Sequence, residues 1–255
     1  MLNWRQKQVV INNLLINYYQ NLEDSNKPVL LFLHGWRSEG LVWKQIVEKM
    51  PACYNIYVLD LSGFGKSQTP PPDFTLQDYA NIINSFIKKF SLSSVVIVGH
   101  SFGGRVTIKL AAQKPGYLNK IVLVDSAGVR QVSLTRSLTV VVAKIIKPLF
   151  KLSFLKNLRR RIYKNLGAQD YLATPKLQSI LLNIINEDLT PLLSKISLPT
   201  LLIWGANDQE TPVAQARVME QLVPGSKLII LSHAGHFSFL DQPDIFVQEL
   251  KKFLN

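Results

Sequence analysis

Short apolar runs alternate with amphipathic stretches along most of the chain. Six runs are predicted to be strands: 28–33, 55–60, 94–99, 120–125, 199–204 and 227–232. Each is rich in Leu or β-branched residues and apolar on both faces, as is typical of strands buried in a parallel sheet. Helical periodicity lies between or after them, at about 41–49, 76–89, 102–113, 212–221 and 243–253. This alternation predicts an α/β fold with a doubly wound, mostly parallel sheet.

A β-hairpin is predicted ahead of these units, over residues 8–19. Two apolar stretches flank Asn12 and Asn13. Asn tolerates the positive φ angles that a two-residue hairpin turn requires.

One region breaks the strand–helix rhythm. Between about 127 and 197 no strand is indicated, and the pattern is helical and amphipathic, with helices expected over 138–149 and 152–163. Pro148 should kink or end the first of them. We therefore expect an α/β core formed by residues 1–126 and 196–255, with a helical cap, residues 127–195, inserted between two strands.

The positive charge of the chain is concentrated in this predicted cap. The net charge is +12, and ten Lys or Arg but no Asp or Glu lie between Ser126 and Gln169, so the rest of the chain carries only +2. Such a block predicts contact with an anionic surface such as lipid headgroups, and the alternative is a solvated helix face. Nucleic acid is not an expected partner, because no nucleic-acid-binding motif accompanies the charge.

Length and composition limit the class of protein. The chain has 255 residues, of which 47% are hydrophobic, enough for a large core. No uncharged apolar run is long enough for a transmembrane helix, and the N-terminus does not resemble a signal peptide. Cys53 is the only cysteine. We expect a cytoplasmic protein, with peripheral contact at the inner membrane surface as a further hypothesis.

The strongest chemical signal is GHSFG, residues 99–103, between a predicted strand and a predicted helix. It matches the nucleophile elbow G-x-S-x-G, in which a strained turn lifts the serine hydroxyl above the sheet. Gly99 and Gly103 leave room for the bend, and the N-terminus of the next helix favours developing negative charge beside Ser101.

A serine nucleophile needs a base that takes its proton. Four histidines compete. We favour His236, because it follows the last predicted strand, where a loop returns over the carboxyl edge of the sheet. His233 lies nearer that strand, His100 is expected to point away from the hydroxyl, and His34 belongs to a different loop.

The acid that orients the imidazole is predicted to be Asp208, just past a strand end and 28 residues before His236. This gives the chain order Ser, Asp, His that accompanies the motif. Asp125 also ends a strand and is the main rival, and Glu210 is a weaker candidate.

Two backbone N–H groups should bind the oxyanion of the tetrahedral intermediate. We expect one from Phe102, directly after the nucleophile, and the other from Trp36, in the loop that Gly35 allows to turn tightly. The alternative for His34 and Gly35 is a simple strand-ending turn.

No cofactor or metal is predicted, since no His, Cys and carboxylate cluster has metal-ligand spacing. The stretch DLSGFGKS, residues 60–67, contains Gly-Lys-Ser but has Asp60 where a phosphate-binding loop needs Gly. We interpret it as a turn in which Asp60 and Ser67 form local hydrogen bonds.

Together these motifs resemble the α/β-hydrolase superfamily, in particular small bacterial esterase-like serine hydrolases with a helical cap. The matching pieces are LFLHGW, DLSGFGKS, GHSFGGR, IVLVDSAG, PTLLIWGANDQETP and HAGHFSFLDQP, which span Pro28 to Pro243. The resemblance implies an eight-stranded, mostly parallel sheet with a triad of Ser101, Asp208 and His236 at its carboxyl edge. It also implies an oxyanion hole formed by Trp36 and Phe102.

The expected function is hydrolysis of a carboxylic ester with an apolar acyl group, through an acyl-enzyme. Because the fold supports many reactions, several alternatives stay open. They are a carbon–carbon bond hydrolase, an acyltransferase, a cofactor-free haloperoxidase and a non-catalytic lipid-binding relative. Ser101 argues against the haloalkane dehalogenases and epoxide hydrolases, which resemble this fold but use an Asp nucleophile.

Overall fold

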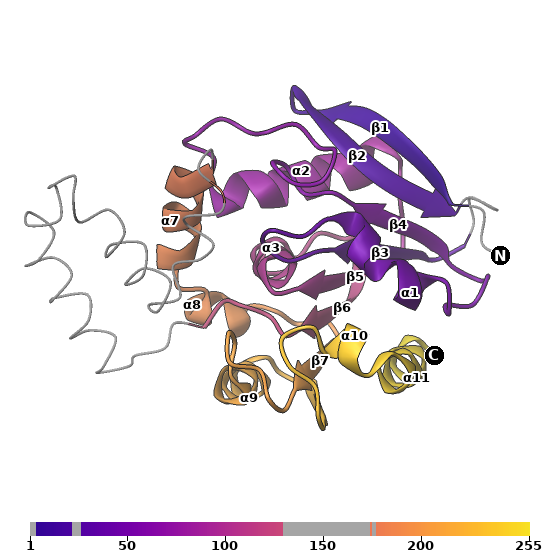
Figure 1. The fold of residues 1–255 in the computed structure, drawn as a ribbon, viewed down its shortest axis with the longest axis vertical. Coiled ribbons are helices and arrows are strands. Elements are labelled where there is room, and N and C mark those ends of the chain that lie inside the picture. The colour runs from indigo at the N-terminus through magenta and orange to yellow at the C-terminus, as the bar shows by residue number, and fades with distance from the viewer. Residues whose placement is uncertain (1–3, 22–26, 130–173, 175–176) are drawn as a thin grey trace, which may run out of the picture.

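The computed structural model describes residues 4–21, 27–129, 174 and 177–255. Eight strands in this part of the chain form one sheet (Figure 1). They are β1 (Arg5–Ile11), β2 (Leu14–Asn21), β3 (Val29–Leu33), β4 (Asn55–Leu59), β5 (Val95–His100), β6 (Leu118–Val124), β7 (Thr200–Gly205) and β8 (Lys227–Leu231). The spatial order is β1-β2-β4-β3-β5-β6-β7-β8.

The sheet is mostly parallel, as the apolar runs predicted. Strands β4, β3, β5, β6, β7 and β8 pair in parallel, while β1 and β2 are antiparallel. Leu14 pairs with Ile11 across a two-residue turn, in which Asn12 and Asn13 have φ angles of 48° and 65°. The predicted hairpin and its turn are therefore confirmed.

Helices cover both faces of the sheet. They comprise the short 3₁₀ helix η1 (Gly40–Trp43) and the helices α1 (Lys44–Val47), α2 (Leu76–Lys89), α3 (Phe102–Ala111), α7 (Gln178–Asn186), α8 (Thr190–Leu193), α9 (Val213–Leu222), α10 (Ser238–Asp241) and α11 (Pro243–Leu254). Helix α2 begins where the sequence predicted, because Thr75 and Asp78 form a reciprocal capping box at its N-terminus.

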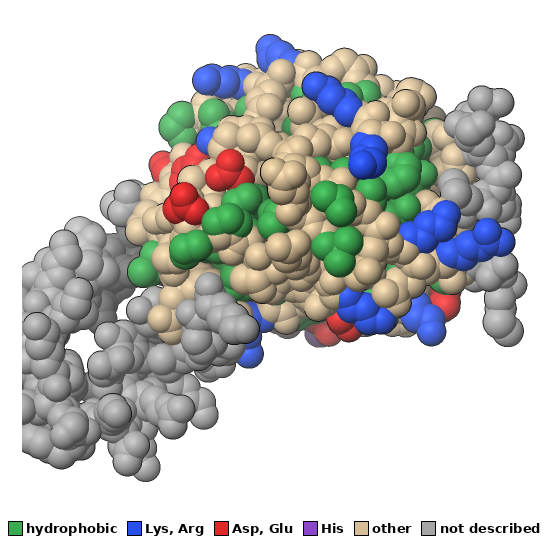
Figure 2. Space-filling view, turned by 90° about the horizontal axis from the view of Figure 1, so that it is seen from above, with side chains coloured by type: hydrophobic (Ala, Val, Ile, Leu, Met, Phe, Trp, Pro, Cys, Tyr) green, Lys and Arg blue, Asp and Glu red, His purple; other side chains and the backbone are tan. Residues whose placement is uncertain are grey.

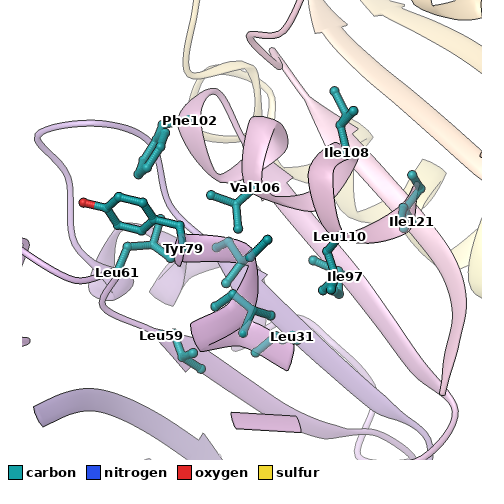
Figure 3. Packing of buried hydrophobic residues seen from close by; sticks show 14 of the residues in the cluster. Leu31, Leu59, Leu61, Tyr79, Ile97, Phe102, Val106, Ile108, Leu110 and Ile121 are labelled. Atoms are coloured by element: carbon teal, nitrogen blue, oxygen red, sulfur yellow. The ribbon is translucent and has the colours of Figure 1, made fainter. Parts of the chain in front are cut away.

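Alternate strand residues feed two separate cores. Leu31, Ile97 and Leu123 pack on one side with α2, α3, α7, α8 and α9. Figure 3 shows part of this core, with Leu31 and Ile97 among the labelled residues. Leu30, Val98 and Ile203 pack on the other side with η1, α1, α10 and α11. Burial on both faces explains why these strands read as continuous apolar runs instead of alternating patterns.

Only part of the predicted cap lies in the described residues. It includes α7 and α8, whose buried residues Ile180, Ile184 and Leu193 belong to the same core as α2 and α3. The predicted helices over 138–149 and 152–163, and the basic block, fall outside the described residues. Figure 2 views the molecule from the end of the sheet that carries the β1–β2 hairpin, where the basic side chains of the described residues are spread over the surface.

No helix among the described residues is both long and apolar enough to cross a membrane.

Candidate active site

Ser101 lies on a strained turn between β5 and α3. Its backbone has φ 49° and ψ −108°, an unusual conformation for a residue with a side chain. The neighbouring glycines permit it. A Cβ on Gly99 would lie 2.5 Å from Thr107 Oγ1, and a Cβ on Gly103 would lie 2.5 Å from the carbonyl oxygen of Leu33. The predicted need for small residues on both sides of the serine is therefore met.

A chain of hydrogen bonds joins Ser101, His236 and Asp208. His236 Nε2 lies 3.0 Å from Ser101 Oγ, and His236 Nδ1 lies 2.9 Å from Asp208 Oδ2. Asp208 follows β7 and His236 follows β8, so the carboxyl ends of neighbouring strands bring the three side chains together. With Nδ1–H donating to Asp208, the neutral imidazole leaves Nε2 free to accept the serine proton.

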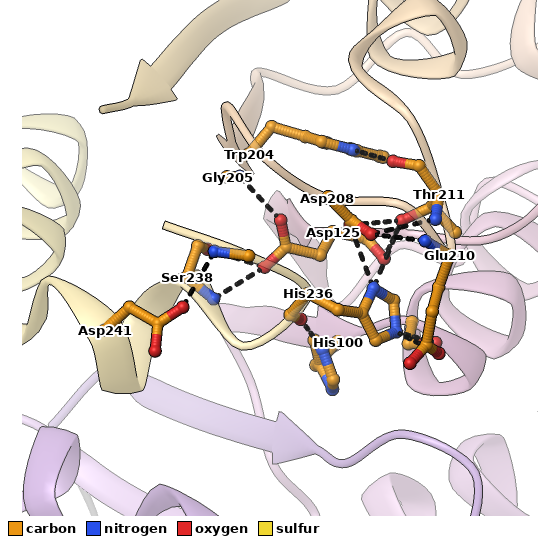
Figure 4. A network of polar contacts seen from close by, with 12 residues as sticks. His100, Asp125, Trp204, Gly205, Asp208, Glu210, Thr211, His236, Ser238 and Asp241 are labelled. Carbon is orange, nitrogen blue, oxygen red and sulfur yellow. Dashed lines mark hydrogen bonds and ion pairs between the residues drawn. The ribbon is translucent and has the colours of Figure 1, made fainter. Parts of the chain in front are cut away.

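Asp208 is held by its own loop. Backbone N–H groups of Glu210 and Thr211 donate to Asp208 Oδ1 over 2.8 and 3.0 Å, and the Thr211 hydroxyl lies 2.7 Å from Oδ2 (Figure 4). Burial alone would raise the pKa of Asp208. The hydrogen bond and charge of His236, together with the bonds from Thr211, instead lower that pKa below its ordinary value. Asp208 is therefore ionised at neutral pH.

The pKa of His236 is raised above its ordinary value. Burial opposes the charged imidazolium, but the hydrogen bond and charge of Asp208 outweigh it, with further contributions from Glu210 and Asp125. A base whose protonated form is stabilised in this way is suited to taking a proton from a serine.

Asp125, the rival acid, does not contact His236. It is fully buried after β6, where Oδ1 accepts the N–H of Gly205 over 2.8 Å and Oδ2 accepts the N–H and hydroxyl of Ser238 over 3.1 and 2.6 Å. Figure 4 shows Asp125 next to Asp208, with its hydrogen bonds running to Gly205 at the end of β7 and to Ser238 in the segment after His236. Burial raises the pKa of Asp125 to about 7 against these hydrogen bonds. It therefore ties together the two loops that carry Asp208 and His236.

His100 is buried, and it is His236, not His100, that bonds the hydroxyl of Ser101. Its Nε2–H donates to the backbone carbonyl of His236 over 2.7 Å, while its Nδ1 has no hydrogen-bond partner. Burial and the neighbouring His236 lower the pKa of His100 to about 3, so it stays neutral. His100 thus holds the backbone at His236 against the turn that carries Ser101. His233 is exposed.

His34 shapes the loop after β3. Its Nδ1–H donates to the carbonyl of Gly35 over 2.7 Å, and its Nε2 accepts the N–H of Leu61 over 2.9 Å. Burial lowers the pKa of His34 to about 4. The loop is held again further along, where Asp60 Oδ1 accepts the N–H of Gly40 over 2.7 Å. The predicted turn at 60–67 is also found, because the Ser67 hydroxyl donates to the carbonyl of Asp60.

Trp36 of this loop meets Phe102 of α3 edge-to-face, with ring centroids 5.2 Å apart. Within the described residues, neither of their backbone N–H groups donates a hydrogen bond. Phe64 stacks edge-on against Trp36 at 4.8 Å. The arrangement offers two N–H groups that have no acceptor in the described part of the chain, on residues whose rings form an aromatic cluster with Phe64.

Sequence reasoning did not identify Thr211, Ser238 or Gly205 as partners of the site carboxylates. Thr211 had a signal, since a Thr three residues after an Asp is a common local hydrogen-bonding pattern. Ser238 and Gly205 had none, because their contacts with Asp125 join distant segments. Among the described residues, no group of three or more His, Cys, Asp or Glu side chains is arranged to hold a metal ion.

Residues 30–249 match the sequence profile of the Alpha/beta hydrolase family. The chain therefore belongs to this family, and it is an enzyme of the hydrolase type.

Two curated relatives cover nearly the whole chain. An uncharacterized hydrolase, YugF of Bacillus subtilis, is 26% identical over 259 residues, covering 93% of each chain. A pimeloyl-[acyl-carrier protein] methyl ester esterase of Nitrosomonas europaea is 30% identical over 245 residues, covering 87% of this chain and 94% of its own. Among solved structures, a bacterial membrane phospholipase A has the same fold, with a TM-score of 0.79 and 24% identity over 99% of this chain and 86% of its own.

Proposed function

We propose that this hydrolase cleaves a carboxylic ester with an apolar acyl group through an acyl-enzyme intermediate. The observation that carries the proposal is the continuous chain of hydrogen bonds from Ser101 Oγ through His236 to Asp208. The relatives whose names specify an ester, the pimeloyl-[acyl-carrier protein] methyl ester esterases, support the same reaction type.

In the proposed first half-reaction, Ser101 Oγ attacks the ester carbonyl carbon while its proton passes to His236 Nε2. The carbonyl oxygen becomes an oxyanion, which the N–H groups of Trp36 and Phe102 stabilise. The imidazolium is stabilised by ionised Asp208. When the tetrahedral intermediate collapses, the C–O bond to the alcohol breaks, and the alcohol oxygen takes the proton from Nε2.

In the second half-reaction, water replaces the alcohol. His236 Nε2 takes a proton from the water as its oxygen attacks the acyl carbon. Collapse then breaks the bond between the acyl group and Ser101 Oγ, which recovers the proton. The products are a carboxylic acid and the free enzyme.

The proposed preference for an apolar acyl group rests on the aromatic side chains around Trp36 and Phe102. Trp36, Phe64 and Phe102 form an aromatic cluster directly beside the two N–H donors. An acyl chain that packs against these rings is removed from water, and each CH₂ group buried in this way contributes about 0.8 kcal/mol to the free energy of binding.

A panel of esters with one leaving group and acyl chains of increasing length tests this function. We expect kcat/KM to rise with the first added CH₂ groups and then level off. Ser101→Ala should lower turnover by about 10⁴ to 10⁶-fold, because triad residues act as a unit. An unchanged circular dichroism spectrum would show that the variant is folded. Retention of more than a tenth of the activity would exclude Ser101 as the nucleophile.

We also propose that residues 127–195 form a cap. In this proposal the protein is cytoplasmic, and the basic block of the cap binds anionic lipid headgroups at the inner membrane surface. The support is the concentration of ten basic residues, with no acidic ones, between Ser126 and Gln169. Each basic residue near an anionic membrane contributes about 1 kcal/mol at low salt. The protein should co-sediment with phosphatidylserine vesicles at low salt and be released by high salt. Equal binding to neutral and anionic vesicles, or none to either, would exclude this contact.

A further inference from the structure

A second carboxylate faces the imidazole of His236 from the side opposite Asp208. Glu210 Oε2 lies 3.4 Å from His236 Nε2, the nitrogen that also faces Ser101 Oγ at 3.0 Å (Figure 4). The Glu210 side chain is 68% exposed, whereas the Asp208 side chain on the Nδ1 side of the ring is fully buried. The two carboxylates therefore lie at opposite ends of the ring, one inside the protein and one at its surface.

The backbone of Glu210 is fixed even though its side chain is exposed. Its N–H donates to Asp208 Oδ1 over 2.8 Å, and the next residue, Thr211, is bonded to the same carboxylate through both its N–H and its hydroxyl. The loop that presents Asp208 to the imidazole thus also fixes the backbone position from which the Glu210 carboxylate reaches Nε2.

The neutral imidazole gives Glu210 no partner of opposite charge. In that state the Nε2 lone pair accepts the serine proton and offers no hydrogen to a carboxylate. Among the residues that the structure describes, the other charged or titratable groups around the ring are Asp208, the buried Asp125 and neutral His100. Asp208 already orients His236 through Nδ1, so Glu210 is not needed for that purpose.

Its position matters for the leaving group. In an ester hydrolase with this triad, Nε2 delivers its proton to the leaving alcohol, so the alcohol oxygen must come within hydrogen-bond distance of Nε2. It then lies close to the Glu210 carboxylate. The Glu210 carboxylate therefore repels a leaving alcohol that has a negative charge next to its ester oxygen, and it attracts one that has a positive charge there.

We propose that Glu210 is a specificity-determining residue that selects against leaving groups with a negative charge next to the ester oxygen and favours neutral or cationic ones. The inference rests on the proposed ester hydrolase function. Because the carboxylate is largely exposed, we expect an effect of about threefold to tenfold at low ionic strength, which decreases as salt screens the charges.

Three butyrate esters test the inference, with a cationic, a neutral and an anionic leaving alcohol: choline, 3,3-dimethylbutanol and 2-sulfoethanol. The ratio of kcat/KM for the choline ester to that for the sulfoethyl ester is measured for the wild type, Glu210→Gln and Glu48→Gln. Glu48→Gln removes the same charge from the end of α1, where Glu48 pairs with Lys44. The dimethylbutyl ester reports the reaction without a charged leaving group.

We expect Glu210→Gln to lower the cation-to-anion ratio by at least threefold at low salt, with little change at 1 M salt, and Glu48→Gln to keep the wild-type ratio. The acidic limb of the kcat/KM profile should also move to lower pH in Glu210→Gln, because loss of the carboxylate lowers the pKa of His236. If the wild type is active on the neutral ester but Glu210→Gln leaves the ratio unchanged, the role of Glu210 is overturned and the ester hydrolase function is not. A wild type inactive on all three esters would overturn both this role and the ester hydrolase function.

Discussion

Asp125 and Asp208 follow neighbouring strands of the same sheet, but they have different partners. Asp208 meets His236 Nδ1 at 2.9 Å, whereas Asp125 accepts hydrogen bonds from Gly205 and Ser238 and does not contact the imidazole. Their pKa values move in opposite directions: that of Asp208 is lowered, and that of Asp125 is raised to about 7.

The difference shows that a carboxylate at a strand end is not sufficient to identify the acid of a triad. Asp208 is three residues beyond the last residue of β7, on a loop that reaches His236, while Asp125 directly follows β6 and is bonded to Gly205 and Ser238 instead. We infer that Asp208 orients the base and that Asp125 is a positioning residue, which joins the segments on which Asp208 and His236 lie.

The largest difference between the two residues is expected in turnover. Asp208→Asn should lower kcat by about 10⁴-fold, because an Asn amide favours the imidazole tautomer that cannot accept the serine proton. The acidic limb of kcat/KM should also move to lower pH, since His236 loses the charge that raises its pKa. Steady-state kinetics from pH 5 to 9 measure both effects. A larger loss in Asp125→Asn than in Asp208→Asn would reverse the assignment.

Asp125→Asn is expected to act through structure more than through chemistry. An Asn can accept hydrogen bonds with only one of its two side-chain atoms, so either Gly205 or Ser238 loses its acceptor. We expect kcat to fall by about tenfold and the free energy of unfolding by about 1–3 kcal/mol, as for other buried donors left unpaired. Urea unfolding and kinetics on the same preparation measure the two. Unchanged stability would contradict a positioning role.

The raised pKa of Asp125 also predicts a pH dependence of stability. Between pH 4 and 7 the folded protein retains the Asp125 proton, whereas the unfolded chain releases it. The contribution of Asp125 to the free energy of unfolding is therefore complete below pH 4 and is lost as the pH rises to 7. The group should account for a loss of about 2 kcal/mol between pH 4.5 and 6.

Comparison with Asp125→Asn isolates the contribution of Asp125 to the pH dependence of the free energy of unfolding. Over the same interval the pKa of Asp208 lies below the window, and the raised pKa of His236 lies above it. The wild type should lose more stability than the variant from pH 4.5 to 6. Parallel stability curves for the two proteins would contradict the assignment.

The smallest effects come from the hydroxyl groups that support the two carboxylates. Thr211→Val removes the hydroxyl 2.7 Å from Asp208, and we expect about a fivefold loss in kcat. Ser238→Ala removes the matching hydroxyl from Asp125, and we expect less than a threefold loss in kcat together with about 1 kcal/mol of stability. A reversed order of the two kcat losses would argue against separate roles for the two acids.

Much of the fold could be predicted from the sequence because its signals are local. The apolar runs identified the six parallel strands to within a few residues, and Asn12-Asn13 identified the hairpin turn. The short helix α10 was missed. It has only four residues, and the bonds from Ser238 at its start to Asp125 are long-range contacts that leave no periodic pattern.

The candidate site was predictable to the extent that its residues follow strand ends. The G-x-S-x-G motif predicted the turn at Ser101. Because parallel strands bring their carboxyl ends to one edge of the sheet, Asp208 and His236 were expected near Ser101. The partners of Asp125 and the approach of Glu210 to Nε2 could not be predicted, because each depends on the path of a loop. The catalytic roles themselves stay predictions that the experiments above address.

The most direct test of the proposed mechanism is the site of reaction with an active-site fluorophosphonate. A serine activated by His236 and Asp208 should form a covalent phosphonyl adduct, and peptide mass mapping should locate it on Ser101 of the wild type. Ser101→Ala should not be labelled, and Asp208→Asn should be labelled far more slowly than Asp125→Asn. An adduct on another residue, or equal labelling of the wild type and Ser101→Ala, would contradict the mechanism.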